Sequence, residues 1–340
     1  MLDVAHYRRA EAIARMQTTS WRIEQAHRPH EFEHVGFPTR VESCADLAAL
    51  VDTMQEERFD CYQAEMGGLS DEDAALLIAK LAQFCRFYAV TFERSWAPLP
   101  LDTMTAHLVL WTKIRGFLGA VPASVLEIGP GCGYLAFFLA DHPHLRYAQV
   151  ETTESFYLLQ HLVNAWCYGL RAIDRAPITT DTDRTDVLRI GKSASCEHFP
   201  WWLDTAPSGP FAVITANACL TELSRAALER YAALIGRALA PDGAVIVQCI
   251  GGGKLPWRDV LETFAGVGLG PLVQARRQPS TVDVLFRRGV EPLRRADAER
   301  WDPLDPLVQR VYLPGDAPRR TWSRAELETA VAAELERLHD

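Results

Sequence analysis

The pattern of apolar and polar positions changes near residue 120. Before it, apolar residues recur at helical spacing, as at Leu77, Leu81 and Phe84, and no segment alternates like a strand. Ser70 followed by acidic residues predicts the start of one helix. Gly119 predicts the end of a second helix, "DTMTAHLVLWTKIRGFLGA". This part of the chain therefore predicts helices only.

From Ser124 onward, short apolar runs alternate with helical stretches. We expect strands at residues 124–128, 146–150, 211–216, 244–249 and 282–287. We expect helices between them at residues 134–140, 155–168 and 222–239. Continuous apolar strands that alternate with helices indicate a parallel sheet covered on both faces. The predicted fold class is thus α/β, with a Rossmann-like sheet and an N-terminal helical cap domain.

These patterns divide the 340 residues into three parts. Residues 1–118 form the helical cap, which binds the substrate or serves as a dimer interface. Residues 119–290 form the sheet domain, and residues 291–340 form a tail. In the tail, Ser323 and Glu326 predict a capping box at the start of a final helix. A chain of this length is expected to form one large domain with an appendage, or two domains.

Composition narrows the classes of partner. The net charge of −9 gives no general attraction to phosphate backbones or anionic membranes, so we expect neither as a partner. The eight cysteines form no C-x-x-C pair, which argues against a zinc site and a disulfide framework. The N-terminus lacks the apolar core of a signal peptide, and no uninterrupted apolar run suits a membrane span. We therefore expect a cytoplasmic protein without a metal.

The segment "VLEIGPGCGYLAFFLA", residues 125–140, places three glycines between a strand and a helix. Glycines allow close approach of the backbone to a ligand, and the helix start offers free N–H groups. Gly129, Gly131 and Gly133 follow G-x-G-x-G spacing, and Tyr134 replaces the third glycine of the dinucleotide fingerprint. A nicotinamide oxidoreductase is therefore a weaker alternative, and a turn that only allows tight strand–helix packing is another.

Glu127 precedes the first glycine, and the resulting E-x-G-x-G-x-G string resembles the first motif of class I S-adenosylmethionine (SAM) methyltransferases. The resemblance implies a Rossmann-like class I methyltransferase sheet that binds SAM and releases S-adenosyl-L-homocysteine (SAH). It places Glu127 and the glycines near the methionine part of the cofactor. It also implies that Glu151, at the end of the second strand, binds the ribose hydroxyls with Thr152 beside it.

Three further segments resemble proteins named as sugar O-methyltransferases. They are "VETTESFYLLQ", "HFPWW" and "NACLTEL", and with the glycine string the resemblance covers roughly residues 120–290. In this family, residues after the fourth strand face the substrate, which makes Asn217 and Glu222 catalytic candidates. Glu222 either removes a proton from a hydroxyl or binds a cationic nitrogen. An acid that stabilises a helix start is the alternative for Glu222 and for Glu154.

His198, Trp201 and Trp202 come after an expected third strand, which precedes residue 198 and is not among the five ranges given above. His198 is a candidate general base, and a buried structural histidine is an equal alternative. The two tryptophans, with Glu154, are candidates for substrate binding. Core packing is the alternative for both tryptophans. Ala218 stands where the related proteins often have a histidine, which leaves O- and N-methylation both open.

The sequence thus predicts a SAM-dependent methyltransferase that acts on an oxygen or nitrogen of a polar small molecule, in specialised metabolism. One alternative is an N-methyltransferase for a cationic amine or guanidino substrate. Another, from a different class, is a SAM-binding partner protein without catalysis. We expect a homodimer.

Overall fold

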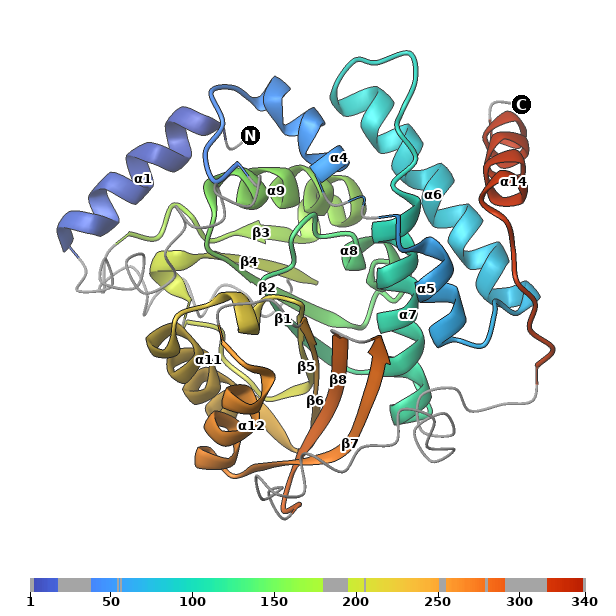
Figure 1. Ribbon diagram of the computed structural model, residues 1–340. Coiled ribbons are helices and arrows are strands. Elements are labelled where there is room, and N and C mark those ends of the chain that lie inside the picture. The colour runs from blue at the N-terminus through green and yellow to red at the C-terminus, as the bar shows by residue number, and fades with distance from the viewer. Residues whose placement is uncertain are drawn as a thin grey trace.

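An eight-stranded sheet organises the molecule (Figure 1). The computed structural model describes residues 3–17, 38–53, 55, 57–179, 195–204, 206–250, 255–278, 281–290 and 317–338, with backbone only at 53, 249–250, 274–278 and 281. The strands are β1 (Ser124–Ile128), β2 (Arg146–Glu151), β3 (Ala172–Asp174), β4 (Cys196–Pro200), β5 (Phe211–Asn217), β6 (Leu239–Ile250), β7 (Leu269–Gln278) and β8 (Thr281–Arg288).

The strand order is β3-β4-β2-β1-β5-β6-β8-β7. All neighbours are parallel except β8, which runs antiparallel to β6 and to β7. The chain moves from β1 to β2 on one side and later returns to place β5 on the other side of β1. In open α/β sheets such a switch point, at the carboxyl ends of the strands, is where ligands bind. The glycine turn lies at this switch point, between β1 and β5.

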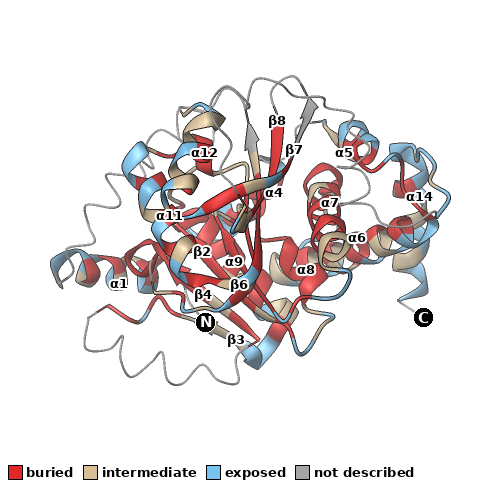
Figure 2. Ribbon diagram, turned by 90° about the horizontal axis from the view of Figure 1, so that it is seen from below, coloured by how far each residue is buried: buried red, intermediate tan, exposed pale blue. Residues whose placement is uncertain are grey.

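Helices cover both faces of the sheet. Their bounds are α1 (Val4–Gln17), α4 (Leu50–Thr53), α5 (Phe59–Glu65), α6 (Asp71–Thr91), α7 (Leu101–Leu118), α8 (Leu135–Leu139), α9 (Glu154–Tyr168), α11 (Arg225–Ala238), α12 (Trp257–Gly266) and α14 (Arg324–Arg337). Short 3₁₀ turns are η1 (Cys44–Ala49), η2 (Gly169–Arg171), η4 (Trp201–Leu203) and η5 (Leu220–Glu222). Helices α7, α8 and α9 lie on one face, and α11 and α12 lie on the other (Figures 1 and 2).

The predicted Rossmann-like α/β fold is confirmed, and each of the five expected strands is present. No residue ranges were predicted for strands β3, β4 and β7 or for helix α12. Helix α7 belongs to the predicted cap, yet it packs on the sheet itself, where Lys113 forms an ion pair with Asp283 of β8. The domain boundary expected at residue 118 therefore falls between α7 and β1, which pack together as helix and sheet.

Helix α6 is the one helix among the described residues that is long and apolar enough to cross a membrane. Lys80 and Arg86 interrupt its apolar residues, so no continuous apolar run marks it in the sequence. Half of that stretch is buried, and the ring of Phe84 lies 5.1 Å from that of Tyr134 and 6.2 Å from that of Phe137. A packed core helix meets the same criterion as a membrane span. Here α6 packs between α8 and the C-terminal α14.

The C-terminal segment 317–338 is attached to the helical layer. Trp322 N donates to Gln63 Oε1 at 2.9 Å, and Gln63 Nε2 donates to the Trp322 carbonyl at 2.9 Å. The capping box is confirmed, because Glu326 N donates to Ser323 Oγ and Ser323 N donates to Glu326 Oε2. The final helix α14 is thus an integral part of the described molecule.

Candidate functional site

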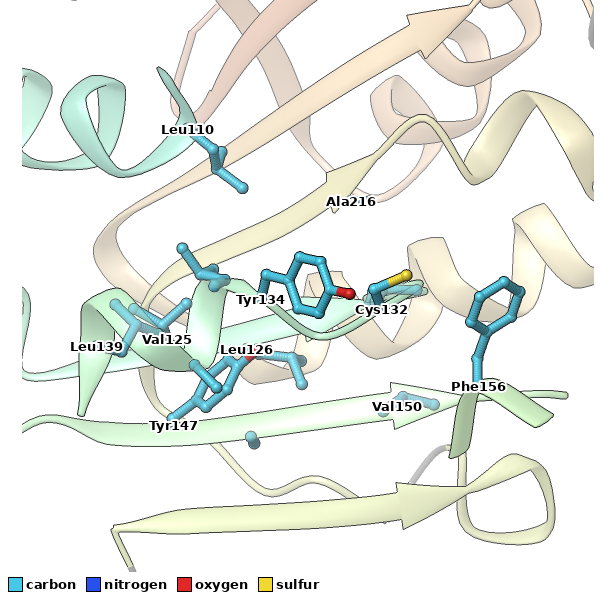
Figure 3. Packing of buried hydrophobic residues seen from close by; sticks show 14 of the residues in the cluster. Leu110, Val125, Leu126, Cys132, Tyr134, Leu139, Tyr147, Val150, Phe156 and Ala216 are labelled. Carbon is cyan, nitrogen blue, oxygen red and sulfur yellow. The ribbon is translucent and has the colours of Figure 1, made fainter. Parts of the chain in front are cut away.

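The glycine turn follows β1 and leads into α8. Gly129, Gly131 and Gly133 have φ angles of 63°, 57° and 74°, a left-handed backbone that side chains disfavour. A Cβ on Gly129 would lie 2.7 Å from Cys219 Cβ, and a Cβ on Gly133 would lie 2.8 Å from Gln160 Cγ. The first and third glycines therefore allow close packing as well as the turn. In Figure 3, Cys132 and Tyr134 of the turn belong to the same packed cluster as β1.

Glu127 lies fully buried beneath this turn. Its Oε2 accepts a short hydrogen bond from the Tyr147 hydroxyl, which in turn accepts from Gln149 Nε2 at 2.6 Å. Asn164 Nδ2 of α9 donates to Gln149 Oε1 at 2.6 Å. Burial raises the pKa of Glu127 to about 8. Its Oε1 has no hydrogen-bond partner within the described structure and is therefore open to a ligand.

Glu127 is one member of a polar row across the sheet. In register, Asp174 pairs with His198, His198 with Gln149, Gln149 with Glu127, and Glu127 with Thr215. Paired residues on neighbouring strands point to the same face, and because Asn164 of α9 binds Gln149, that face is the one covered by α9. Buried parallel strands are normally apolar on both faces. The row was not predicted, because single polar residues inside apolar runs carry no clear signal.

Glu151 ends β2, and its carboxylate is already extensively hydrogen-bonded. Oε1 accepts from Thr152 N at 2.7 Å, Thr153 N at 2.9 Å and Thr153 Oγ1 at 3.0 Å. Oε2 accepts from Gln160 Nε2 at 2.9 Å. Burial raises the pKa of Glu151, and the hydrogen bonds oppose that shift. A carboxylate oxygen accepts about two hydrogen bonds, and Oε2 has one in the described structure, so it retains room for a ligand hydroxyl.

Gln160, on α9, was not predicted, yet it connects three parts of the site. Besides Glu151, its Nε2 donates to the Gly131 carbonyl at 2.6 Å. Its Oε1 lies 2.8 Å from Nε2 of His198. Since an amide oxygen only accepts, His198 must carry its proton on Nε2. Gln160 thus holds the glycine turn, the acid of β2 and strand β4 in fixed relation.

The structure places His198 inside the sheet rather than in a loop. It is buried, and its ring stacks on Tyr157 with centroids 3.7 Å apart and planes 11° apart. Burial, with the nearby His161, holds the pKa of His198 well below its usual range. A neutral imidazole with Nε2 engaged favours a structural role, and its role as base stays a prediction.

The loop after β5 carries the other catalytic candidates. Asn217 ends the strand, and Ala218 has a φ of 66°, an uncommon left-handed backbone for a residue with a side chain. Cys219 Sγ donates to the carbonyl of Ile128 at 3.1 Å, just before the first glycine. Partly exposed Glu222 follows in η5. The structure therefore brings the loop of Asn217 and Glu222 next to the glycine turn.

Glu154 is placed differently from expectation. Its side chain is buried, Arg8 of α1 binds both oxygens at 2.8 and 2.9 Å, and Arg40 NH1 binds Oε2 at 2.6 Å. Burial alone would raise the pKa of Glu154, but the two arginines outweigh it and hold the pKa below its usual range. The predicted contact between Glu154 and a substrate stays a prediction that this geometry does not favour.

The tryptophans lie under the same N-terminal elements. Trp201 Nε1 donates to Glu11 at 3.0 Å, and Arg40 binds Glu11 through both of its terminal nitrogens at 2.8 and 2.9 Å. Trp202 packs against Tyr7, with ring centroids 5.2 Å apart. We call α1 with residues 38–41 the N-terminal clasp. Both tryptophans are buried beneath it. Their contact with a substrate stays a prediction.

Residues 38–50 lie against the start of α9 and the glycine turn. Ser155 N donates to the Thr39 carbonyl at 3.3 Å, and Ser155 Oγ donates to the Pro38 carbonyl. Cys132 Sγ, in the glycine turn, contacts the Leu50 carbonyl at 3.9 Å. These contacts join residues 38–50 to the start of α9 and to the turn. These contacts could not be predicted, since the partners are far apart along the chain.

No protein-family model and no curated protein matches the chain. Solved structures do match, over about half of it. A TehB-like SAM-dependent methyltransferase from Corynebacterium glutamicum is 15% identical, with a TM-score of 0.38, over 52% of this chain and 87% of that one. The glycopeptide N-methyltransferase MtfA, solved with SAM, is 13% identical with a TM-score of 0.36, over 54% and 87%.

The [4+2]-cyclase SpnF matches at 13% identity and a TM-score of 0.39, over 56% of this chain and 83% of that one. These likenesses concern the fold alone. What the chain binds depends on the residues at the glycine turn.

Proposed function

We propose that the chain is a SAM-dependent methyltransferase that acts on an oxygen or nitrogen of a polar small molecule in specialised metabolism. One observation carries the proposal. Three left-handed glycines form the turn at the switch point of the sheet, with one buried acid on each of β1 and β2 beside it. The residues fit the cofactor, because buried Glu127 Oε1 lacks a donor within the described structure and SAM carries an ammonium group.

Glu127 and the glycines would hold the methionine part, and Glu151 with Thr152 would hold the ribose. Glu151 is pre-positioned by Gln160 and Thr153, so little ordering is needed when a ligand binds. Bound SAM would supply an electrophilic methyl group, and this chain would position the acceptor atom and provide a base for its proton. Glu222 suits the base better than His198, because Glu222 is partly exposed beside the turn.

A matched pair of glycine variants tests the cofactor assignment by calorimetric titration with SAM and SAH. Gly129→Ala places a Cβ 2.7 Å from Cys219 Cβ, and we expect at least about a tenfold loss of affinity. Gly119→Ala has a similar φ of 66° but meets no atom within 4 Å, so we expect unchanged affinity. Glu151→Ala should also lose affinity.

If the wild-type protein binds a nicotinamide dinucleotide and neither SAM nor SAH, the proposal fails. Binding of SAM without methylation of any acceptor would favour the alternative of a non-catalytic SAM-binding partner protein. Methylation of arginine-like or amine acceptors alone would favour the N-methyltransferase alternative.

We further propose a cytoplasmic homodimer without a metal, a membrane or a nucleic-acid partner. The acidic net charge supports the last point, because phosphate backbones attract basic surfaces. Light scattering coupled to gel filtration measures the oligomeric state. A mass of one chain, 38.0 kDa, would exclude the dimer.

A further inference from the structure

An apolar cavity lies at the end of α6 and is separate from the candidate site. The last residues of α6, the start of η1 and the second half of α9 form it, and its volume is about 560 Å³. Pockets of roughly 300 to 1,000 Å³ hold ligands of drug size, so an aromatic side chain fits inside. Its larger apolar lining residues are Val90, Phe92, Leu162 and Trp166, and no candidate cofactor or catalytic residue lines it.

The chain just beyond α6 exposes a large aromatic side chain. Trp96 comes two residues after Arg94 of the lining and is 69% exposed, and Val90 in the lining is 67% exposed. An apolar surface with polar residues at its rim indicates an interaction site. Tryptophan is also enriched among the residues that carry most of the energy of an interface. The surface therefore presents a cavity and an exposed aromatic side chain next to each other.

Glu93, in the turn that ends α6, has a side chain at a position that favours glycine. Arg94 N donates to the Ala89 carbonyl at 3.1 Å, the hydrogen bond that closes a Schellman turn. Glu93 has a φ of 51°, the left-handed backbone that glycine usually supplies in this turn. A side chain in this conformation costs stability, and such strain is concentrated at functional positions. The carboxylate of Glu93 is therefore a candidate for a contact outside its own chain.

The charges of this turn are complementary to a second copy of the same turn. Glu93 and Arg94 are both exposed, and among the described residues neither forms an ion pair. In a dimer with twofold symmetry the same surface of both chains meets, so each contact occurs twice. A twofold axis at this turn sets Glu93 of each chain opposite the partner's Arg94. A turn with two charges of one sign would instead repel its own copy.

We propose that residues 90–96, with the start of η1 and the second half of α9, form the interface of a twofold-symmetric homodimer. In this dimer Trp96 of each chain enters the cavity of the other chain. The proposal deepens the proposed homodimer and is independent of the cofactor. A second copy is the occupant that fits, because one chain supplies the aromatic side chain, the cavity and both charges.

Sedimentation velocity over a series of protein concentrations measures the dissociation constant of the dimer. Trp96→Ser removes the aromatic side chain, and we expect the dissociation constant to rise at least about thirtyfold. Ala165→Phe narrows the cavity at an exposed position and should also raise it, whereas Ala165→Ser should not. Met16→Ser is the matched control, because it removes an apolar side chain that is 78% exposed on α1, outside the cavity. We expect this control to leave the dissociation constant unchanged.

Charge reversal tests the twofold arrangement. Glu93→Arg and Arg94→Glu each set like charges opposite one another across the axis, so each should raise the dissociation constant at least about tenfold. The double variant exchanges the two charges and should return the dissociation constant to within about threefold of the wild-type value. Loss of the dimer in the single variants without recovery in the double variant would overturn the twofold pairing.

Glu93→Gly separates the interface from the fold. In the Trp96→Ser background, where the chain is expected to be monomeric, the glycine suits the left-handed turn and should raise the urea midpoint of unfolding. In the otherwise wild-type chain the same substitution should weaken the dimer. A variant that changes the unfolding midpoint alone would show that the Glu93 carboxylate makes no contact with a partner.

The outcomes for the wild type distinguish the levels of the proposal. A monomer at every concentration would overturn the interface and the proposed homodimer together, and calorimetric titration with indole would then test the cavity as a small-molecule site. A dimer that Trp96→Ser and both charge reversals leave intact would overturn this interface alone. Titration with SAH tests the proposed methyltransferase separately, because the cavity does not include the glycine turn.

Discussion

Replacing Gln160 with methionine removes its hydrogen bonds and keeps the length of the side chain. Three partners lose a bond: the Gly131 carbonyl, Glu151 Oε2 and His198 Nε2. A buried polar group left without its bond costs about 1 to 3 kcal/mol. Some of this cost is relieved by local rearrangement, so we expect the free energy of unfolding to fall by about 3 kcal/mol. Urea denaturation measures this loss.

Binding measurements then distinguish positioning from general destabilisation. Gln160 holds Glu151, which is expected to bind the ribose hydroxyls. We therefore expect Gln160→Met to weaken SAH about tenfold, and to weaken an SAH analogue without the 3′-hydroxyl less than about threefold. Nitrogen chemical shifts of His198 provide a second measurement, because the variant removes the acceptor that fixes its proton on Nε2.

Gln149→Met is the matched control. Gln149 is equally buried, but its bonds go to Tyr147 and Asn164 on the Glu127 side. Gln149→Met should lose about as much stability as Gln160→Met. The difference in affinity between SAH and the deoxy analogue should stay as it is in the wild type. If Gln160→Met lost the same affinity for both ligands, Gln160 would not act through Glu151 and the reasoning would be wrong.

Three other substitutions probe separate parts of the molecule. Burial raises the pKa of Glu127 from 4.5 to about 8, so the stability linked to its neutral form is present below pH 4.5 and lost as pH rises to 8. Over this range the free energy of unfolding of Glu127→Gln, measured with urea, should therefore rise relative to that of wild type by up to about 1.4 kcal/mol per pH unit. Parallel plots of unfolding free energy against pH for the two proteins would contradict this. Arg8→Met removes a two-point contact with Glu154 and should speed amide hydrogen exchange in α1 about tenfold, whereas the exposed neighbour Arg9→Met should not. Lys113→Met leaves Asp283 and Glu65 buried without that cation and should cost about 3 to 5 kcal/mol. Lys80→Met, whose partner Asp141 is half exposed, should cost less, and equal losses would count against the burial argument.

The strands of the parallel core could be predicted because burial on both faces requires continuous apolar runs. "SVLEI" and "FAVITA" are such runs, and the structure places strands at both. Strand β4, "CEHFP", was missed because His198 and Glu197 interrupt its apolar character. The glycine turn was predicted from its spacing, and its left-handed backbone follows from the same residues.

The contacts that complete the candidate site could not be predicted, because they join residues far apart in the chain. The acids Glu151 and Glu154 lie three residues apart at the same corner of the sheet. Yet Glu151 is bound by Gln160 and its own loop, whereas Glu154 is bound by Arg8 and Arg40. Nothing in "VETTES" distinguishes a ligand-binding acid from one that docks a helix. Only the fold decides which acid meets the arginines.

The polar row across the sheet explains why this corner tolerates so many buried polar groups. Gln149, Glu127 and Thr215 lie two residues before Glu151, Gly129 and Asn217, which form the edge of the candidate site, and His198 pairs with Gln149. Through Gln160, His198 supports Glu151, and through Tyr147, Gln149 supports Glu127. Apolar residues would pack this layer at lower cost but would leave both acids without support. The acid with an oxygen still lacking a described donor, Glu127, is the one that lies directly under the glycine turn. Burying the polar groups of the row lowers the stability of the sheet. A bound ligand that supplied the missing donor to Glu127 would offset part of this cost, so ligand binding would stabilise the whole sheet.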